Sequence, residues 1–183
     1  MAEPGLLLIR GLGHSGSTIL DLALGAHPQV VGVGEAVRVL ARPAPDDVGR
    51  GPQRLRRELR FERRCTCGEL AGDCRVWGPL LAWLPEHDDC SLAEKFNRLI
   101  QSLATASPRW VVESFQADQE LVEDHSLGRP VRVIQLTRDV RSWVHSESRR
   151  GVERHGRGAG VGWRSLLRWW RVNRRLDKKL HRC

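Results

Sequence analysis

A run of glycine, serine and threonine residues near the N-terminus has the composition and spacing of an anion-binding loop. The run covers residues 11–18 and reads Gly-Leu-Gly-His-Ser-Gly-Ser-Thr, between an apolar stretch at 6–9 and a periodic apolar stretch at 19–26. This order predicts a strand, a tight turn and the start of a helix. Backbone N–H groups in such a turn point at one spot, and the helix N-terminus adds partial positive charge there. The residues that we expect to bind a phosphate or a similar anion are Gly13, His14, Ser15, Gly16, Ser17 and Thr18.

The loop differs from that of nucleotide hydrolases at one position. Its spacing is close to G-x-x-x-x-G-K-S/T, but Ser17 stands where the lysine would be. That lysine contacts the β- and γ-phosphates, so its absence argues against an ATP or GTP hydrolase and favours another phosphate-containing donor. The structural alternative is an ordinary strand–turn–helix connection that is built from small residues.

A glutamate follows the second predicted strand, at 29–33. Gly34 and Glu35 come directly after this strand, where the next helix would begin. Ligands of open parallel sheets bind outside the carboxyl ends of the strands, so Glu35 and the loop at 11–18 could share one site with a partly buried mouth. On position alone, the preferred interpretation is a carboxylate that stabilises a helix N-terminus.

An arginine follows the most apolar predicted strand, at 131–136. Ser146 lies eight residues after Arg138, roughly two turns into the next predicted helix. The planar arginine fork suits bidentate contact with a phosphate, and the turn could bring the serine hydroxyl towards the same anion. On spacing alone, a surface ion pair of Arg138 with Asp139 or Glu147 is the favoured alternative.

Strands and helices alternate along the chain. The expected strands lie at 5–10, 29–33, 110–112 and 131–136, and the expected helices at 19–26, 54–64, 91–104, 116–124, 140–150 and 163–181. This alternation predicts an α/β protein with a mainly parallel sheet. A chain of 183 residues is long enough for a single domain with a substantial core. Glycine and arginine residues predict a flexible loop at 151–162.

Charge and hydropathy restrict the function classes. No apolar run approaches the roughly 20 residues of a membrane span, and no basic region precedes the first apolar run, so we expect a cytoplasmic protein without a secretory signal. The net charge is +8, but residues 138–183 hold 14 Lys and Arg against 4 Asp and Glu. A basic end of this kind suits nucleic acid, a membrane surface, an anionic ligand or a solvated helix face. Nucleic acid is disfavoured because no recognised nucleic-acid motif accompanies Trp163, Trp169 and Trp170.

Four cysteines lie close together in the sequence. They are Cys65, Cys67, Cys74 and Cys90, and Cys183 ends the chain. Four such residues could bind zinc, but the C-x-C start and the wide last gap fit the common zinc spacings poorly. Because disulfides are rare inside cells, we favour small buried thiols in a variable insertion at 42–90, and we expect no metal.

Together these motifs resemble the sulfotransferase family, whose donor is 3′-phosphoadenosine-5′-phosphosulfate (PAPS). The matching residues are the loop at 11–18, His27-Pro28, Gly34-Glu35, and Leu136-Thr137-Arg138-Asp139 with Ser146. The arrangement of His27-Pro28 and Gly34-Glu35 is similar to the branch that contains the tyrosylprotein sulfotransferases, and the cysteine segment resembles an insertion in bacterial members. The resemblance implies a three-layer α/β/α fold of the P-loop nucleotide-kinase type.

The resemblance also implies a role for each residue. The loop from Gly13 to Thr18 would bind the 5′-phosphosulfate, and Arg138 and Ser146 would bind the 3′-phosphate. His14 would stabilise charge on the departing phosphate, and Glu35 would take the proton of a hydroxyl or amine on a small-molecule, sugar or peptide acceptor. No metal is needed for this transfer.

The sequence departs from the family at three points, one of which is the absence of the lysine that many relatives place near the strand ending in Val112-Glu113-Ser114. His14 stands where relatives usually have Lys or Arg. Relatives usually continue through another strand and a late basic loop, so we expect the C-terminal part of the family domain to be missing from residues 1–183. The alternative functions are a P-loop nucleotide or small-molecule kinase and a non-catalytic fragment that binds anions or nucleic acid.

Overall fold

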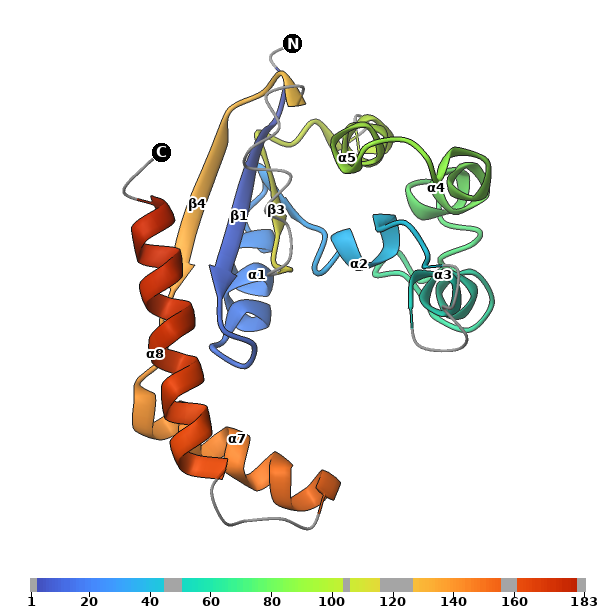
Figure 1. The fold of residues 1–183 in the computed structure, drawn as a ribbon. Coiled ribbons are helices and arrows are strands. Elements are labelled where there is room, and N and C mark those ends of the chain that lie inside the picture. The colour runs from blue at the N-terminus through green and yellow to red at the C-terminus, as the bar shows by residue number, and fades with distance from the viewer. Residues whose placement is uncertain (1–2, 45–50, 104–105, 116–126, 156–160, 181–183) are drawn as a thin grey trace.

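The core of the protein is a four-stranded parallel sheet with the order β2-β3-β1-β4. The strands of this computed structural model are β1 (Gly5–Gly11), β2 (Val30–Gly32), β3 (Trp110–Glu113) and β4 (Val131–Leu136). The structure describes residues 1–183 except 1–2, 45–50, 104–105, 116–126, 156–160 and 181–183 (Figure 1). Every pairing is parallel, which confirms the predicted sheet.

Helices surround the sheet and form a separate layer beside it (Figure 1). They are α1 (Ser17–Gly25), α2 (Val37–Leu40), α3 (Pro52–Phe61), α4 (Trp77–Trp83), η1 (Leu84–His87), α5 (Leu92–Ser102), α7 (Val140–His155) and α8 (Val161–Leu180). Within the described parts of the chain, no helix is both long and apolar enough to cross a membrane.

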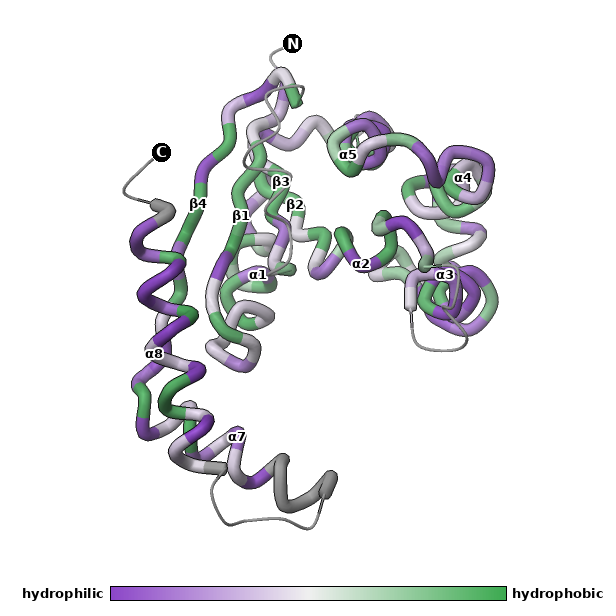
Figure 2. Tube along the Cα trace, in the orientation of Figure 1, coloured by the Kyte–Doolittle hydropathy of each residue, from purple (hydrophilic) through white to green (hydrophobic). Residues whose placement is uncertain are grey.

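The two faces of the sheet pack against different helices. Leu6, Leu8 and Val111 share a buried apolar cluster with residues of α2, α4 and α5. Because side chains alternate along a strand, Ile9 and Val112 lie on the opposite face, where α1 contacts β1, β2 and β3. Figure 2 shows this hydrophobic layer along β1 and the adjoining helices, whereas α8 alternates between hydrophilic and hydrophobic residues.

The described part of the segment at 42–90 packs into the core. Three leucines of α4 and η1 are almost fully buried, namely Leu80, Leu81 and Leu84. Helix α3 contacts α2, and helix α4 contacts α5. The buried Arg56 of α3 donates two hydrogen bonds to the Asp88 carboxylate, at 2.8 and 2.9 Å. These contacts hold the helical layer together.

The helix boundaries differ from the predicted ones in the last third of the chain. The loop expected at 151–162 is wrong at both ends, because residues 151–155 belong to α7 and α8 begins at Val161. Gly151 costs a helix only about 1 kcal/mol, which the flanking residues can offset. The helix expected at 116–124 lies outside the described residues. The helix expected at 91–104 is observed as α5, and Ser91 and Glu94 form a capping box at its start.

Candidate anion-binding site at the carboxyl edge of the sheet

The glycine-rich loop leaves the central strand at the carboxyl edge of the sheet. Gly11 ends β1 where the strands approach closely, and a Cβ there would collide with the Leu136 carbonyl oxygen. Gly16 is the N-cap of α1 and adopts a φ of 102°, which favours glycine. His14 also has a positive φ, of 70°. Two left-handed residues therefore shape this turn, and one of them is not a glycine.

Hydrogen bonds fix the loop and leave the N-terminus of α1 facing outwards. The Ser15 N–H donates to the Leu12 carbonyl at 3.1 Å, and the Trp143 indole Nε1 donates to the Gly13 carbonyl at 2.8 Å. No side chain in the described structure caps α1. The first N–H groups of a helix have no intrahelical acceptor, so those at Ser17 and Thr18 can receive an anion.

Arg138 reaches the loop from the far end of the sequence. Its Nη1 donates to the His14 carbonyl at 3.0 Å, across 124 residues. Trp169 of α8 donates its indole N–H to the Arg138 carbonyl at 3.0 Å. The alternative pairing of Arg138 with Asp139 is not the observed one, because Asp139 accepts from the backbone N–H groups of Arg141 and Ser142.

Asp139 itself begins α7. Its Oδ1 accepts both backbone N–H groups at 3.1 Å, and these hydrogen bonds lower the pKa of the Asp139 carboxyl. A carboxylate at this position also stabilises the positive end of the helix dipole. Asp139 therefore fixes the first turn of the helix that carries Trp143 and Ser146.

Ser146 lies on the side of α7 that faces the loop. Residues three and four apart share one face of a helix, and the neighbouring residues Trp143 and Glu147 both contact the loop. Glu147 Oε1 lies 3.9 Å from His14 Nε2 and its Oε2 lies 3.8 Å from Arg168 Nη1. The sequence indicated Glu147 only as an alternative partner of Arg138, although its i+4 spacing from Trp143 could have indicated its contact with the loop.

Glu35 lies at the same edge but in a different setting. It follows β2, and β3 separates β2 from β1, so roughly 10 Å lies between the two strand ends. Its side chain is 45% exposed and accepts a hydrogen bond from Arg38 at 2.7 Å. The Glu35 side chain is therefore about half-buried, next to the buried start of α2, where Ala36 and Val37 are 1% and 3% exposed.

Two buried carboxyl groups hold the Glu35 turn, and neither role was predicted from the sequence. Asp21 of α1 is 6% exposed, and burial raises the pKa of its carboxyl to about 6, although a Gly34 backbone hydrogen bond acts in the other direction. Glu113 is fully buried at the end of β3 and accepts from the N–H groups of Val37, at 3.2 Å, and Phe115, at 2.9 Å. In the sequence, Glu113 comes directly after a buried strand and Asp21 lies on the apolar side of a helix, and these positions could have indicated buried carboxyl groups.

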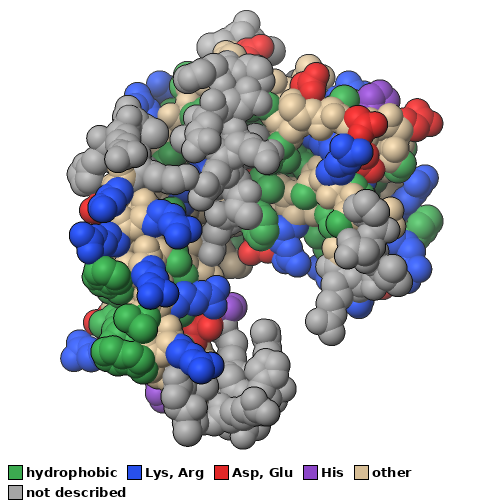
Figure 3. All heavy atoms as spheres, in the orientation of Figure 1, with side chains coloured by type: hydrophobic (Ala, Val, Ile, Leu, Met, Phe, Trp, Pro, Cys, Tyr) green, Lys and Arg blue, Asp and Glu red, His purple; other side chains and the backbone are tan. Residues whose placement is uncertain are grey.

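The basic end of the chain forms a ridge along α8. Figure 3 shows Lys and Arg side chains gathered there, interspersed with hydrophobic ones. A shallow cavity of about 340 Å³ lies between Arg164, Arg168, Arg171 and Arg175. Trp163 and Trp170 are exposed, whereas Trp169 is used as a hydrogen-bond donor within the fold.

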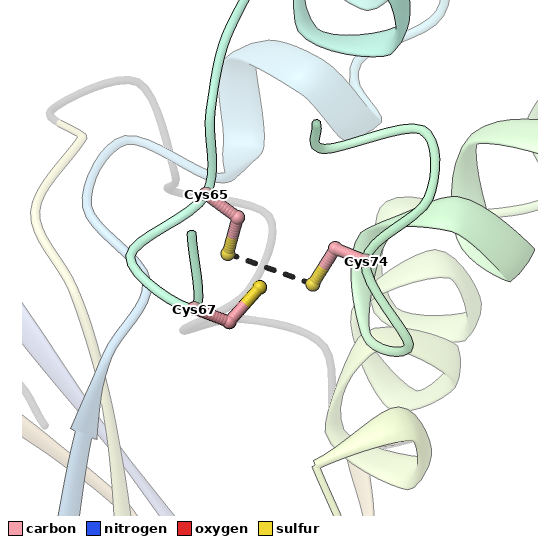
Figure 4. Close-up of side chains that lie close together, drawn as sticks. All are labelled: Cys65, Cys67 and Cys74. Atoms are coloured by element: carbon pink, nitrogen blue, oxygen red, sulfur yellow. Dashed lines mark hydrogen bonds between the residues drawn. The ribbon is translucent and has the colours of Figure 1, made fainter. Parts of the chain in front are cut away.

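Three of the cysteines meet in the connection between α3 and α4. The sulfur atoms of Cys65, Cys67 and Cys74 all lie within 4.8 Å of one another (Figure 4). Cys74 is buried, Cys65 is half-buried and Cys67 is exposed. The expectation of buried thiols therefore holds only for Cys74. Cys90 is not part of the group.

The comparisons with known proteins give the class of fold. No protein-family profile and no curated protein matches the chain. Among solved structures, the sulfotransferase domain of the olefin synthase from Synechococcus PCC 7002 is similar, with a TM-score of 0.55 and 16% identity. The match covers 92% of this chain and 61% of that domain. The protein therefore has a sulfotransferase-like α/β fold and spans about three fifths of this neighbour's length.

Proposed function

We propose that the protein is a sulfotransferase that moves a sulfuryl group from PAPS to a hydroxyl or amine acceptor. The observation that carries the proposal is the hydrogen bond between Arg138 Nη1 and the His14 carbonyl. It joins two motifs that each suit a phosphate, and PAPS carries phosphate at both its 5′ and 3′ positions. The sulfotransferase-like fold supports the same class of reaction.

In this proposal the loop binds the 5′-phosphosulfate. The N–H groups and hydroxyls of Ser17 and Thr18 lie at the positive end of α1, where an anion is stabilised. His14 would donate a hydrogen bond to the oxygen that leaves with the phosphate. Glu147, 3.9 Å away, would orient the imidazole. Such positioning and charge stabilisation account for most of the catalysis in the analogous phosphoryl transfers.

Arg138 and Ser146 would select the donor. The contact with the His14 carbonyl uses one guanidinium nitrogen, and an arginine has five N–H donors in a fixed fork. The remaining donors can bind the 3′-phosphate together with the Ser146 hydroxyl. ATP and ADP have no 3′-phosphate, so this pair would discriminate against them.

Glu35 would act as the base. The acceptor oxygen or nitrogen forms the new bond to sulfur, the bond from sulfur to the 5′-phosphate oxygen breaks, and the acceptor proton passes to the Glu35 carboxylate. Because Arg38 occupies one of its oxygens, the acceptor would meet the other oxygen or displace the arginine. The exposed position of Glu35 suits an acceptor that approaches from solvent.

Transfer of labelled sulfate from PAPS tests the proposal. We expect product with at least one acceptor among phenols, sugars, amines and tyrosine peptides. Glu35→Gln should reduce transfer by about 100-fold or more while adenosine 3′,5′-bisphosphate still binds. Glu86→Gln, which changes an exposed glutamate in η1, is the matched control and should transfer normally.

Two results would contradict the proposal. Undiminished transfer by Glu35→Gln would remove the glutamate from the mechanism. Phosphate transfer from ATP, without sulfate transfer from PAPS, would favour the kinase alternative.

A further inference from the structure

A tight turn between α3 and α4 brings Cys65 and Cys67 together. Arg64 and Leu70 form an antiparallel bridge, and the Cys65 N–H donates to the Glu69 carbonyl at 2.8 Å. The Gly68 N–H closes the turn on the Cys65 carbonyl at 2.9 Å. Gly68 has a φ of 94°, so a residue with a Cβ would strain the turn. The turn thereby directs the thiols of Cys65 and Cys67 to the same side.

The third thiol, that of Cys74, comes from the segment just before α4 and is held by separate contacts. The Cys74 N–H donates to the Leu70 carbonyl at 2.9 Å, and the Cys74 carbonyl accepts from Gly78 at 2.7 Å. Gly72 lies so close to α3 that a Cβ would press on the Arg60 carbonyl. The backbone on both sides of Cys74 is therefore fixed, and its buried sulfur points at the turn (Figure 4).

The sulfur positions fit a metal better than a disulfide. Cys65 Sγ and Cys74 Sγ are 3.5 Å apart, and all three sulfurs lie within 4.8 Å of one another. Thiolates at about 2.3 Å from a tetrahedral zinc ion lie roughly 3.8 Å apart, whereas a disulfide requires about 2.05 Å. All three cysteines are free thiols in the structure.

We propose that Cys65, Cys67 and Cys74 bind one zinc ion that fastens the connection between α3 and α4. Three thiolates are soft ligands that select zinc over magnesium or calcium. Each thiol gives up its proton to solvent on binding. Water takes the fourth position, next to the exposed Cys67. The ion lies in the helical layer and is independent of the anion-binding loop, so this site stands whether or not the proposed transfer reaction is correct.

The test measures metal content and cobalt binding on the untagged full chain. The chain is purified anaerobically in the presence of a phosphine reductant, and its zinc content is quantified by elemental mass spectrometry. We expect about one ion per chain. Titration with Co²⁺ should give the sulfur-to-cobalt charge-transfer bands of a thiolate site. These two measurements on the unmodified protein do not depend on any variant folding.

Two cysteine variants locate the site. Cys67→Ser is the clean change, because this side chain is exposed and its loss leaves the core intact. It should abolish stoichiometric zinc and the charge-transfer bands while the far-ultraviolet circular dichroism stays helical. Cys90→Ser is the matched control, since Cys90 lies in the same segment outside the group, and it should retain both signals.

Removal of the ion with a chelator tests whether the ion stabilises the fold. It should lower the melting temperature of the unmodified chain and leave that of Cys67→Ser unchanged. The proposal is overturned if the folded chain binds neither Zn²⁺ nor Co²⁺, if Cys67→Ser binds as much as the unmodified chain, or if the chain loses 2 Da through a disulfide between Cys65 and Cys74 under the reducing preparation. An unchanged melting temperature on chelation would overturn the fastening role.

Discussion

At the scale of single residues, the buried carboxyl of Asp21 couples the stability of the fold to pH. It lies between α1 and the turn that carries Glu35, and a Cβ at Gly32 would come within 2.9 Å of its Oδ1. This Oδ1 has no hydrogen-bond partner in the described structure. Burial disfavours the charged carboxylate, so the folded state holds a proton at Asp21 more tightly than the unfolded state does.

This raised pKa predicts a pH dependence of stability. The Asp21 pKa rises from 3.8 to about 6. The protonated carboxyl therefore adds to the free energy of unfolding in full below pH 3.8, and this stabilisation is lost as the pH rises through about 6. Asp21→Asn removes the titration. As the pH rises from 4 to 7.5, the free energy of unfolding of this variant should increase by about 1 to 2 kcal/mol relative to that of the unmodified chain, after allowance for solvent screening.

Urea unfolding of both proteins across this pH range measures the difference. A stability difference that stays constant from pH 4 to pH 7.5 would show that Asp21 keeps an ordinary pKa in the folded protein.

The sequence predicted some site residues and missed others for a physical reason. His14, Glu35 and Arg138 lie in local motifs, and each was found at the carboxyl edge of the sheet. Trp143 and Glu113 act through partners that are 130 and 76 residues away. Such contacts form only once the strands are in register, so a local pattern can mark Glu113 as a carboxylate directly after a buried strand but cannot identify its partners.

At the scale of elements, α7 is the support of the loop. Trp143 is 1% exposed and its indole N–H holds the Gly13 carbonyl. Asp139 fixes the start of the same helix, and α8 packs against it. The geometry of the anion-binding turn therefore depends on a helix that begins more than 120 residues later.

Trp143→Phe tests this support. The ring is largely retained, but the hydrogen bond to Gly13 is lost and a small cavity is left, so the free energy of unfolding should fall by about 1 to 3 kcal/mol. Trp163→Phe is the control, because Trp163 is 67% exposed, and it should change stability by less than about 0.5 kcal/mol. Equal effects of the two changes in urea unfolding would contradict the support role.

The main strands and the long helices could be predicted, whereas the short helices could not. Apolar runs that alternate with helical patterns identified all four strands of the sheet. α2 has four residues and is held by Glu113 from β3. α4 contains Gly78 and Pro79, which are typical of loops, but Gly78 allows close packing on the Gly72 carbonyl. Tertiary contacts override local preference at both places.

At the scale of the whole molecule, positive charge and the anion-binding edge lie on the same side of the fold. α8 carries the basic ridge of Figure 3 and also supports Arg138 through Trp169. This field would attract an anionic donor. It would also attract any polyanion, with an affinity that falls steeply as salt increases, so general anion binding does not by itself indicate the proposed donor.

The most direct measurement is calorimetric binding of adenosine 3′,5′-bisphosphate compared with ADP, at one salt concentration. The unmodified chain should bind the bisphosphate at least about tenfold more tightly, since a charge-assisted hydrogen bond contributes about 1.5 to 3 kcal/mol. Arg138→Ala should remove this preference, whereas Arg141→Ala, at an 89% exposed arginine in the first turn of α7, should keep it. Equal or tighter binding of ADP by the unmodified chain would contradict the assignment of PAPS as the donor.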